Sequence, residues 1–492
     1  MTTVARRTLF RLLVAFTLVW IGWAGWSLIG RSDSYRLRVL DDLGSPIAGA
    51  VIDSNGSQLG ITGANGTVEL VWTRSRRILE VSAPGHVSRT TTVNEAPESN
   101  LDVVLRARVL RGRVVDSEGV GLEGALVVAG SATGLSDSQG VFQVRGAEEG
   151  TVEVERPAWL PATFEWDEAG PGEQTVELEP FTARAVHIGG ELAVADLDSY
   201  VDMAMDTELN ALMIDIKDET GHVFYDTNVS TAIDADAVPA ETFDLTDTVT
   251  HAHDLGLYVI ARIVVFNDPL VAQSRSDLAV WDSATDAPYE ANGQFFLDPT
   301  DRAARQYGID LGVEACELGV DEIQFDYVRF PDDRRESATF DGGVSPEVRK
   351  SAISGFLNEA VNMLRPKGCA VAADIFGYLT TATNDGGIGQ RWEEVAGIVD
   401  VISPMLYPSH YDANWYGFPD PDDYPAEMID EALADGMRRL TRKPVIRPWL
   451  QDFDYQAADV RAEIAATEEY GLGWMLWNSE SKVTVDALEP AE

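Results

Sequence analysis

The sequence predicts an α/β protein in which a (β/α)8 TIM barrel follows two small all-β sandwich domains and an N-terminal transmembrane helix. Three observations predict this architecture: an uncharged apolar run near the N-terminus, two similar segments of short strands and turns, and eight apolar strands that alternate with helical stretches. At 492 residues the chain is also too long for one typical compact domain.

The charge and the cysteine count exclude several classes of protein. The chain has 37 Lys and Arg against 81 Asp and Glu, a net charge of -44. Such a surface repels phosphate backbones, so nucleic acid is excluded as a partner. The two cysteines, Cys316 and Cys369, indicate neither a disulfide framework nor a structural zinc site. They leave open one disulfide between them.

The first segment, residues 1–34, has the pattern of a membrane anchor. Arg6, Arg7 and Arg11 precede an uncharged run at 12–29. At about 1.5 Å per residue this run nearly crosses a ~30 Å hydrocarbon core, and the arginines favour a cytoplasmic N-terminus. A cleaved signal peptide is the competing interpretation. Because the run is long and no small-x-small cleavage site follows it, we expect a single-pass signal anchor with the other domains extracellular.

Two similar segments follow, at 35–107 and 108–181. The first contains "LRVLDDLGSPIAGAVI" and "TGANGTVELV", and the second contains "LRGRVVDSEGVGLEGALVV" and "LSDSQGVFQV". Short β-branched runs between Gly, Asp, Asn and Pro turns predict small β-sandwiches. Both segments resemble the carboxypeptidase regulatory-like, transthyretin-like sandwich. That resemblance implies spacer or attachment domains without catalytic residues.

Residues 182–492 predict the barrel. The candidate strands lie at 184–190, 210–218, 258–266, 321–330, 369–377, 400–408, 444–453 and 473–478, and helix-like segments include 197–208, 245–256, 301–319, 345–365 and 455–471. This alternation is typical of a (β/α)8 barrel. A doubly wound open sheet is the alternative, but no Gly-rich nucleotide loop follows an early strand.

The fourth strand, within "GVDEIQFDYVRFP", alternates polar and apolar residues. Successive side chains of a strand point to opposite faces. In a barrel, Ile323 and Phe325 would therefore face the helices, while Glu322, Gln324 and Asp326 would face the lumen. Asp326 would lie nearest the carboxyl-terminal mouth, where barrel active sites are built.

The same reasoning collects polar and aromatic residues from the other strands at this mouth. Asp326 and Asp374 are the candidate catalytic residues, and the candidate substrate-binding residues are Asp215, Lys217, Arg262, Gln324, Arg329, Tyr378, Tyr407, His410, Arg447, Trp449, Gln451 and Trp477. Any one inward carboxylate could instead be a buried ion-pair partner, for instance Asp215 with Arg262 or Lys217. Their convergence on one end of different strands favours a functional site.

Residues 183–480 resemble a bacterial glycoside hydrolase family of alpha-amylase-like barrels that was long catalogued as a domain of unknown function. The resemblance rests on "DEIQFDYVRFP", "ADIFGY", "VDVISPMLYPSHY", "RPWLQDF" and "GWMLWN". It implies a nucleophilic Asp326 and an acid/base at the end of strand five, where Asp374 stands in place of the commoner Glu. Gln324 replaces the arginine usual two residues before the nucleophile, and Arg329 lies three residues after it.

These observations predict a membrane-anchored extracellular glycoside hydrolase that cleaves a cell-envelope or extracellular polysaccharide through paired carboxylates, without a cofactor. Aromatic rings such as Tyr378, Trp449 and Trp477 suit sugar faces, whereas a phosphoryl substrate would call for a more basic mouth. Two alternatives stay open: a non-catalytic glycan-binding protein on the same barrel, and a polysaccharide-modifying enzyme such as a deacetylase. The latter usually needs a metal, and no His/Asp ligand cluster is visible in the sequence.

Overall fold

The computed structural model describes residues 34–491 except 73, 74, 96, 98, 99, 171, 442 and 443. The predicted anchor run at 12–29 and its arginines lie outside the described residues. Within the described part of the chain, no helix is both long and apolar enough to span a bilayer. The chain divides into two compact units: one holds the residues up to Val154 together with Ala162–Glu177, and the other holds Glu155–Pro161 and the residues from Leu178 onward.

The first unit contains two β-sandwiches with matching strand orders. In the first sandwich the sheets run β4-β1-β8-β6 and β3-β2-β5-β7, and in the second they run β12-β9-β15 and β11-β10-β13-β14. The central pairs β1–β8 and β9–β15 are both parallel. The predicted β-rich region before the barrel is therefore confirmed, and its two segments share one topology.

The strand bounds of this unit are as follows: β1 Ser34–Asp41, β2 Val51–Ser54, β3 Ser57–Ile61, β4 Thr67–Val71, β5 Arg77–Ser82, β6 His86–Val87, β7 Arg89–Val93, β8 Leu101–Ala107, β9 Val109–Val115, β10 Leu126–Ala129, β11 Ala132–Leu135, β12 Val141–Arg145, β13 Gly150–Glu155, β14 Ala162–Trp166 and β15 Gln174–Glu177. Alternate residues are buried along several of them, for example along β8. One face of each such strand thus forms the sandwich core, as period-two patterning dictates.

The second unit is a closed parallel barrel. Its strands are β16 Arg184–Ile188, β17 Ala211–Lys217, β18 Tyr258–Val264, β23 Glu322–Asp326, β25 Ala370–Phe376, β26 Val401–Leu406, β27 Val445–Ile446, β28 Trp449–Gln451 and β29 Trp474–Trp477. The sheet order β25-β23-β18-β17-β16-β29-β28-β26 closes through the pairing of β25 with β26. Both β27 and β28 pair with β26, so they form one interrupted stave. The predicted eight-stranded barrel is confirmed.

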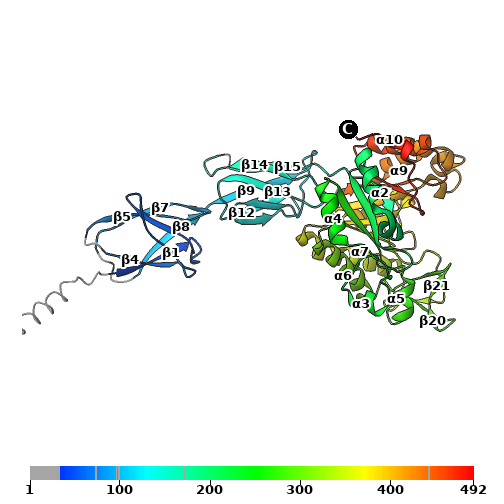
Figure 1. Cartoon of the computed structure of the whole chain (residues 1–492), viewed down its shortest axis with the longest axis horizontal. Helices are drawn as coiled ribbons and strands as arrows, with labels where there is room; N and C mark the ends of the chain where they lie inside the picture. Colours follow the sequence, from blue (N-terminus) through cyan, green and yellow to red (C-terminus); the bar gives the residue numbers. More distant parts are fainter. Residues whose placement is uncertain are drawn as a thin grey trace, which may run out of the picture. The chain divides into compact units, whose positions relative to one another are not determined.

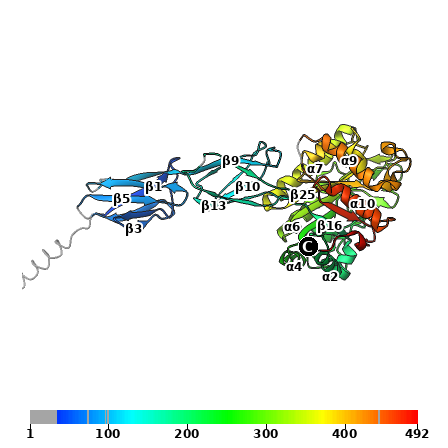
Figure 2. The same ribbon diagram turned by 90° about the horizontal axis from the view of Figure 1, so that it is seen from above.

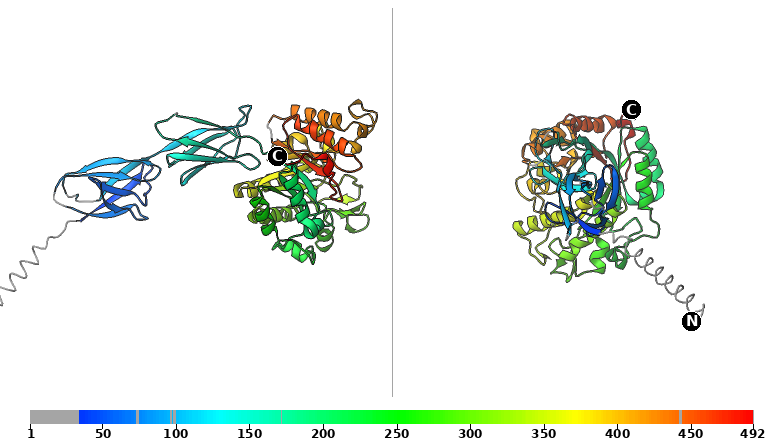
Figure 3. Two further views of the ribbon diagram at one scale, coloured as in Figure 1. Left: turned by 45° about the horizontal axis from the view of Figure 1, so that its top comes forward. Right: turned by 90° about the vertical axis from the view of Figure 1, so that its left-hand side faces the viewer.

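Helices surround these strands on the outside (Figures 1 and 2). They are α2 Gly190–Asp206, α3 Ser230–Asp234, α4 Leu245–Asp254, α5 Pro269–Ser274, α6 Arg302–Glu317, α7 Pro346–Leu364, α8 Trp392–Ala396, α9 Pro425–Arg438 and α10 Ala457–Glu468. Asp244, Asp268, Asp301 and Ser345 cap the first turns of α4, α5, α6 and α7. The views of Figure 3 show this layer from two further sides.

Shorter elements lie in the connections. The short strands are β19 Trp281–Asp282, β20 Ala287–Pro288, β21 Glu290–Ala291, β22 Gln294–Phe295 and β24 Ala338–Thr339, and the 3-10 helices are η1 Arg365–Lys367, η2 Gly377–Thr380, η3 Pro408–His410, η4 Trp415–Gly417, η5 Pro421–Asp423 and η6 Val485–Ala487. Of these, η2 and η3 follow β25 and β26 directly and reach the mouth of the barrel.

The barrel strands divide their side chains as predicted. Ile323 and Phe325 belong to the large core between strands and helices. Glu322, Gln324 and Asp326 instead bond to residues of other strands across the lumen. A disulfide joins Cys316 of α6 to Cys369, just before β25, which settles the pairing that the sequence left open.

Candidate functional site

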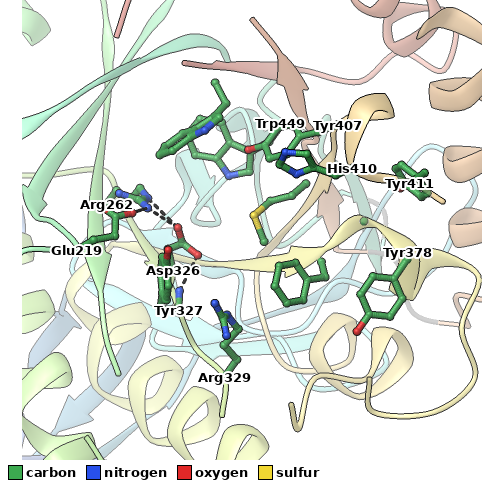
Figure 4. Close-up of a pocket in the computed structure, with 14 residues that line it drawn as sticks. Glu219, Arg262, Asp326, Tyr327, Arg329, Tyr378, Tyr407, His410, Tyr411 and Trp449 are labelled. Carbon is green, nitrogen blue, oxygen red and sulfur yellow. Dashed lines mark hydrogen bonds and ion pairs between the residues drawn. The ribbon is translucent and has the colours of Figure 1, made fainter. Parts of the chain in front are cut away.

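A cavity of about 330 Å³ lies at the carboxyl ends of the barrel strands (Figure 4). Its walls are formed by Glu219, Arg262, Asp326, Tyr327, Arg329, Phe376, Gly377, Tyr378, Met405, Tyr407, His410, Tyr411, Trp449 and Trp477. These residues come from six of the eight staves and from the loops that follow them. The cavity therefore occupies the end of the fold where barrel enzymes build their active sites.

Arg262 of β18 is the electrostatic centre of this cavity. Its Nη1 donates to Asp215 at 2.9 Å, its Nε donates to Asp326 at 3.1 Å, and its Nη2 donates to both Glu219 and Asp326. Burial alone would lower the pKa of Arg262, but the surrounding carboxylates outweigh it and raise that pKa well above its usual value. The guanidinium is therefore a permanent cation that contacts three carboxyl groups.

Asp326 is held at the end of β23 by the backbone that follows it. Its Oδ1 accepts a hydrogen bond from the N–H of Tyr327 at 2.6 Å. Tyr327 adopts a φ of +48°, a left-handed conformation that is rare for an aromatic residue and costs energy. The turn points this N–H at the carboxylate, while Oδ2 stays on Arg262. Both oxygens of Asp326 are thus fixed, and its side chain still lines the cavity.

Asp374 of β25 lies beneath the cavity wall rather than in it. Its Oδ1 accepts from Gln324 Nε2 at 2.6 Å and from Trp449 Nε1 at 2.7 Å, and its Oδ2 has no hydrogen-bond partner among the described residues. Burial, together with the charge of Asp326, raises the pKa of Asp374 well above its usual range. Asp374 is therefore a fully buried carboxyl whose neutral form is favoured, and it is absent from the cavity walls.

Asp215 of β17 links Arg262 to a histidine. Its Oδ2 lies 2.9 Å from His187 Nε2, and the His187 ring packs on Trp477 with ring centres 4.2 Å apart. Burial would raise the pKa of Asp215, but Arg262 and His187 outweigh it, and the pKa falls below its usual value. Asp215 thus acts as an ionised counter-ion behind the cavity, as the ion-pair interpretation predicts.

Four other predicted binding residues are absent from the cavity wall, and two of them, Lys217 and Arg447, form buried ion pairs. A β-bulge between Asp215 and Lys217 rotates Lys217, whose ammonium lies 3.0 Å from Asp268 and 2.7 Å from the carbonyl oxygen of Val264. Arg447 forms a fully buried bidentate pair with Glu322, at 2.7 and 3.2 Å. We predicted that Lys217 and Arg447 contact substrate. In the structure both cations instead pair with buried carboxylates, so their role is structural.

The side chain of Gln451 also forms hydrogen bonds within the protein. Its Oε1 accepts from the N–H and the hydroxyl of Ser409, at 3.1 and 2.8 Å, so it holds the loop after β26. The side-chain amide of Gln324 donates a hydrogen bond to Asp374. The predicted residues that the structure does bring together in the cavity are Arg262, Asp326, Arg329, Tyr378, Tyr407, His410, Trp449 and Trp477.

Aromatic rings form much of the cavity wall. The Arg329 guanidinium lies 4.7 Å from the ring centre of Tyr327 and 5.0 Å from that of Phe376. Trp449 and Trp477 meet edge to face with ring centres 5.4 Å apart. Figure 4 shows Tyr407, His410 and Tyr378 across the cavity from Asp326. Carboxylates beside apolar ring faces suit a polyhydroxylated ligand.

Several cavity residues were missed by the sequence analysis, above all Glu219. It lies two residues after the end of β17, and its carboxylate reaches Arg262 from the loop. Its position just beyond an inward-facing strand end was the available signal. His187 could have been found from strand parity, because Ala185 of the same strand also faces the lumen. Among the described residues, no group of three or more His, Cys, Asp or Glu side chains is arranged to hold a metal ion.

Comparison with protein families gives a match over residues 185–483 to the family described as "Putative glycosyl hydrolase domain". The chain belongs to this family. The matched region runs from the second residue of β16 past the end of β29 and contains every residue of the cavity wall. Membership of the glycosyl hydrolase domain family supports an enzyme that acts on glycans. A comparison with curated proteins found no match.

Solved structures similar to this chain include a hypothetical protein from Ruminiclostridium thermocellum, with 33% identity, a TM-score of 0.35, and coverage of 38% of this chain and 96% of that one. The PgaB (BpsB) glycoside hydrolase domain from Bordetella bronchiseptica shares 13% identity, with a TM-score of 0.46, over 63% of this chain and 99% of that one. The glycoside hydrolase domain of PelA from Pseudomonas aeruginosa shares 12% identity, with a TM-score of 0.36, over 62% and 96%.

Proposed function

We propose that the protein is a glycoside hydrolase that cleaves a cell-envelope or extracellular polysaccharide, with Asp326 as the carboxylate that attacks or stabilises the anomeric carbon. One observation carries this proposal: a carboxylate fixed on both oxygens faces a cavity whose walls are formed largely by aromatic rings. Glycosidic cleavage needs such a negative charge next to an oxocarbenium-like centre. Preorganised charge of this kind stabilises a transition state without reorganisation during the reaction.

The chain's own residues divide the remaining tasks. Arg262 holds the Asp326 carboxylate in place through hydrogen bonds from its Nε and Nη2. Trp449, Trp477 and Tyr407 offer aromatic rings to a sugar. A second carboxyl group must give a proton to the leaving oxygen. Asp374 has the raised pKa that such an acid needs, whereas Glu219 has the access.

We also propose that residues 1–34 anchor the chain in the membrane and that the two β-sandwiches, of carboxypeptidase regulatory-like type, act as spacers outside the cell. The arginines before the apolar run support this orientation. The disulfide Cys316–Cys369 fits an oxidising compartment. Protease added to intact cells is expected to release the barrel and leave an N-terminal stub in the membrane. A barrel fully protected from protease would contradict the proposal.

The proposed activity is tested by screening purified protein against a library of bacterial envelope and extracellular polysaccharides for newly formed reducing ends. Asp326→Asn serves as the matched inactive control. We expect at least one polymer to be cleaved by the wild type and spared by the variant. Binding of a polymer without cleavage by the wild type would favour the non-catalytic alternative. Release of acetate without new reducing ends would favour a deacetylase.

A further inference from the structure

We propose that Glu219, and not Asp374, is the proton donor of the proposed reaction, and that the reaction proceeds with retention of anomeric configuration. This inference rests on the proposed glycosidase function and on Asp326 as its nucleophile. It assigns to Glu219 a catalytic role that the family match does not indicate.

The carboxyl groups of Glu219 and Asp374 differ in their access to the cavity. The Glu219 side chain is 34% exposed and forms part of the cavity wall. The Asp374 side chain is 0% exposed and lies behind Arg262 and Trp449. A general acid must come within hydrogen-bond distance of the oxygen that it protonates. Asp374 does not line the cavity, and its Oδ1 accepts hydrogen bonds from Gln324 and Trp449.

The spacing of Glu219 and Asp326 is set by one nitrogen atom. Asp326 Oδ2 and Glu219 Oε1 both accept a hydrogen bond from Arg262 Nη2. With hydrogen bonds of about 3 Å, the two carboxylate oxygens lie within about 6 Å of each other. Retaining glycosidases place their carboxyl groups about 5–5.5 Å apart, and inverting enzymes about 6.5–9.5 Å. The shared nitrogen therefore favours the shorter, retaining spacing over the longer, inverting one.

The bond changes follow from this pair. The Asp326 carboxylate forms a bond to the anomeric carbon, the bond from that carbon to the leaving oxygen breaks, and the proton of Glu219 passes to the leaving oxygen. A water then gives its proton to the Glu219 carboxylate and its oxygen to the anomeric carbon. The bond between Asp326 and the sugar breaks, and Asp326 is again a carboxylate.

Arg262 gives this pair an electrostatic advantage. Before the first step the negative charge is on Asp326 and Glu219 carries the proton. After the step Asp326 is an ester and the charge is on Glu219. Because both groups contact the same Nη2, the charge moves between two partners of one guanidinium. Arg262 keeps the same number of ionised partners, so little reorganisation of the buried charges is needed.

Glu219→Gln, Asp374→Asn and the exposed-loop control Glu241→Gln test this assignment. Each is assayed on the polymer that the wild type cleaves and on a dinitrophenyl glycoside of the same sugar, whose leaving group needs no protonation. For Glu219→Gln we expect kcat/KM on the polymer to fall by about 10²–10⁴-fold, while kcat/KM on the aryl glycoside falls by less than about tenfold. Added azide should speed turnover and give a glycosyl azide of retained configuration. Glu241→Gln should behave as the wild type.

Several outcomes would overturn the inference. Equal losses on both substrates for Glu219→Gln would make it a positioning residue, and a loss confined to the polymer for Asp374→Asn would transfer the role to Asp374. NMR of the first product anomer should show retention, and an inverted product would exclude the pair as assigned. A wild type that cleaves no glycan would instead refute the proposed function itself, which separates that failure from the failure of Glu219.

Discussion

Asp374 shows at the scale of one residue how burial sets protonation. Its neutral form is favoured in the folded protein because burial and the Asp326 charge raise its pKa. In the unfolded chain the carboxyl returns to a pKa of about 3.9. The stability that it contributes is therefore complete below that pH, and it is lost as the pH rises through the folded-state pKa.

Asp374→Asn should remove this loss of stability at rising pH, because the amide keeps the shape of the carboxyl and cannot ionise. The free energy of unfolding, measured with urea from about pH 4 to pH 8, should fall less steeply with pH for the variant than for the wild type. Asp202→Asn, at an exposed position of α2, is the matched control and should follow the wild type. Identical slopes for Asp374→Asn and the wild type would show that Asp374 is ionised in the folded protein.

Single residues also show which parts of the site could be predicted from the sequence and which could not. Strand parity correctly placed Arg262, Asp326 and Trp449 at the cavity, because a period of two fixes which face a side chain takes. It misplaced Lys217, because a β-bulge inserts an extra residue and cannot be read from apolar spacing. Glu219 was missed because a loop residue follows no period.

At the scale of elements, each barrel strand was predictable and one long helix was overlooked. The segment of α9, Pro425–Arg438, buries Met428, Ile429, Ala432 and Leu433 on one side, so its helical spacing was present in the sequence. The disulfide was different, because two cysteines can also remain free thiols. Whether they meet depends on how α6 packs against the barrel, and no local pattern encodes that packing.

The disulfide predicts a measurable contribution to barrel stability. It closes a loop of 53 residues between α6 and β25. By the chain-entropy model, a loop of this size stabilises the fold by about 4 kcal/mol, within an observed range of roughly 0–5 kcal/mol. The double variant Cys316→Ser, Cys369→Ser should therefore unfold at lower urea concentration, as should the reduced wild type. Reductant should leave the double variant unchanged, and an oxidised wild type no more stable than this variant would contradict the account.

At the scale of the whole molecule, acidic charge dominates. The 81 acidic residues exceed the 37 basic ones, so the chain has a large excess of negative charge. The mutual repulsion of these acidic groups destabilises the compact state, and salt screens it as the Debye length falls from about 10 Å at 0.1 M to about 3 Å at 1 M.

We therefore expect the melting temperature to rise when sodium chloride is increased from 0.05 to 1 M, by about 2–4 °C for each kcal/mol gained. Scanning calorimetry at constant pH measures this effect, and potassium chloride should give the same rise if screening is the cause. A melting temperature that falls with salt would mean that attractive ion pairs outweigh the acidic excess.

The central claim is that Asp326 performs chemistry, and Asp326→Asn tests it most directly when turnover, glycan binding and melting temperature are measured together. Arg262 keeps Asp215 and Glu219 in the variant, so the loss of stability should stay below the ~3–5 kcal/mol that a stranded buried cation would cost. The account predicts a variant that melts close to the wild type, still binds the glycan and produces no new reducing ends. A stable variant that still cleaves would contradict it, as would a variant that is inactive only because it unfolds.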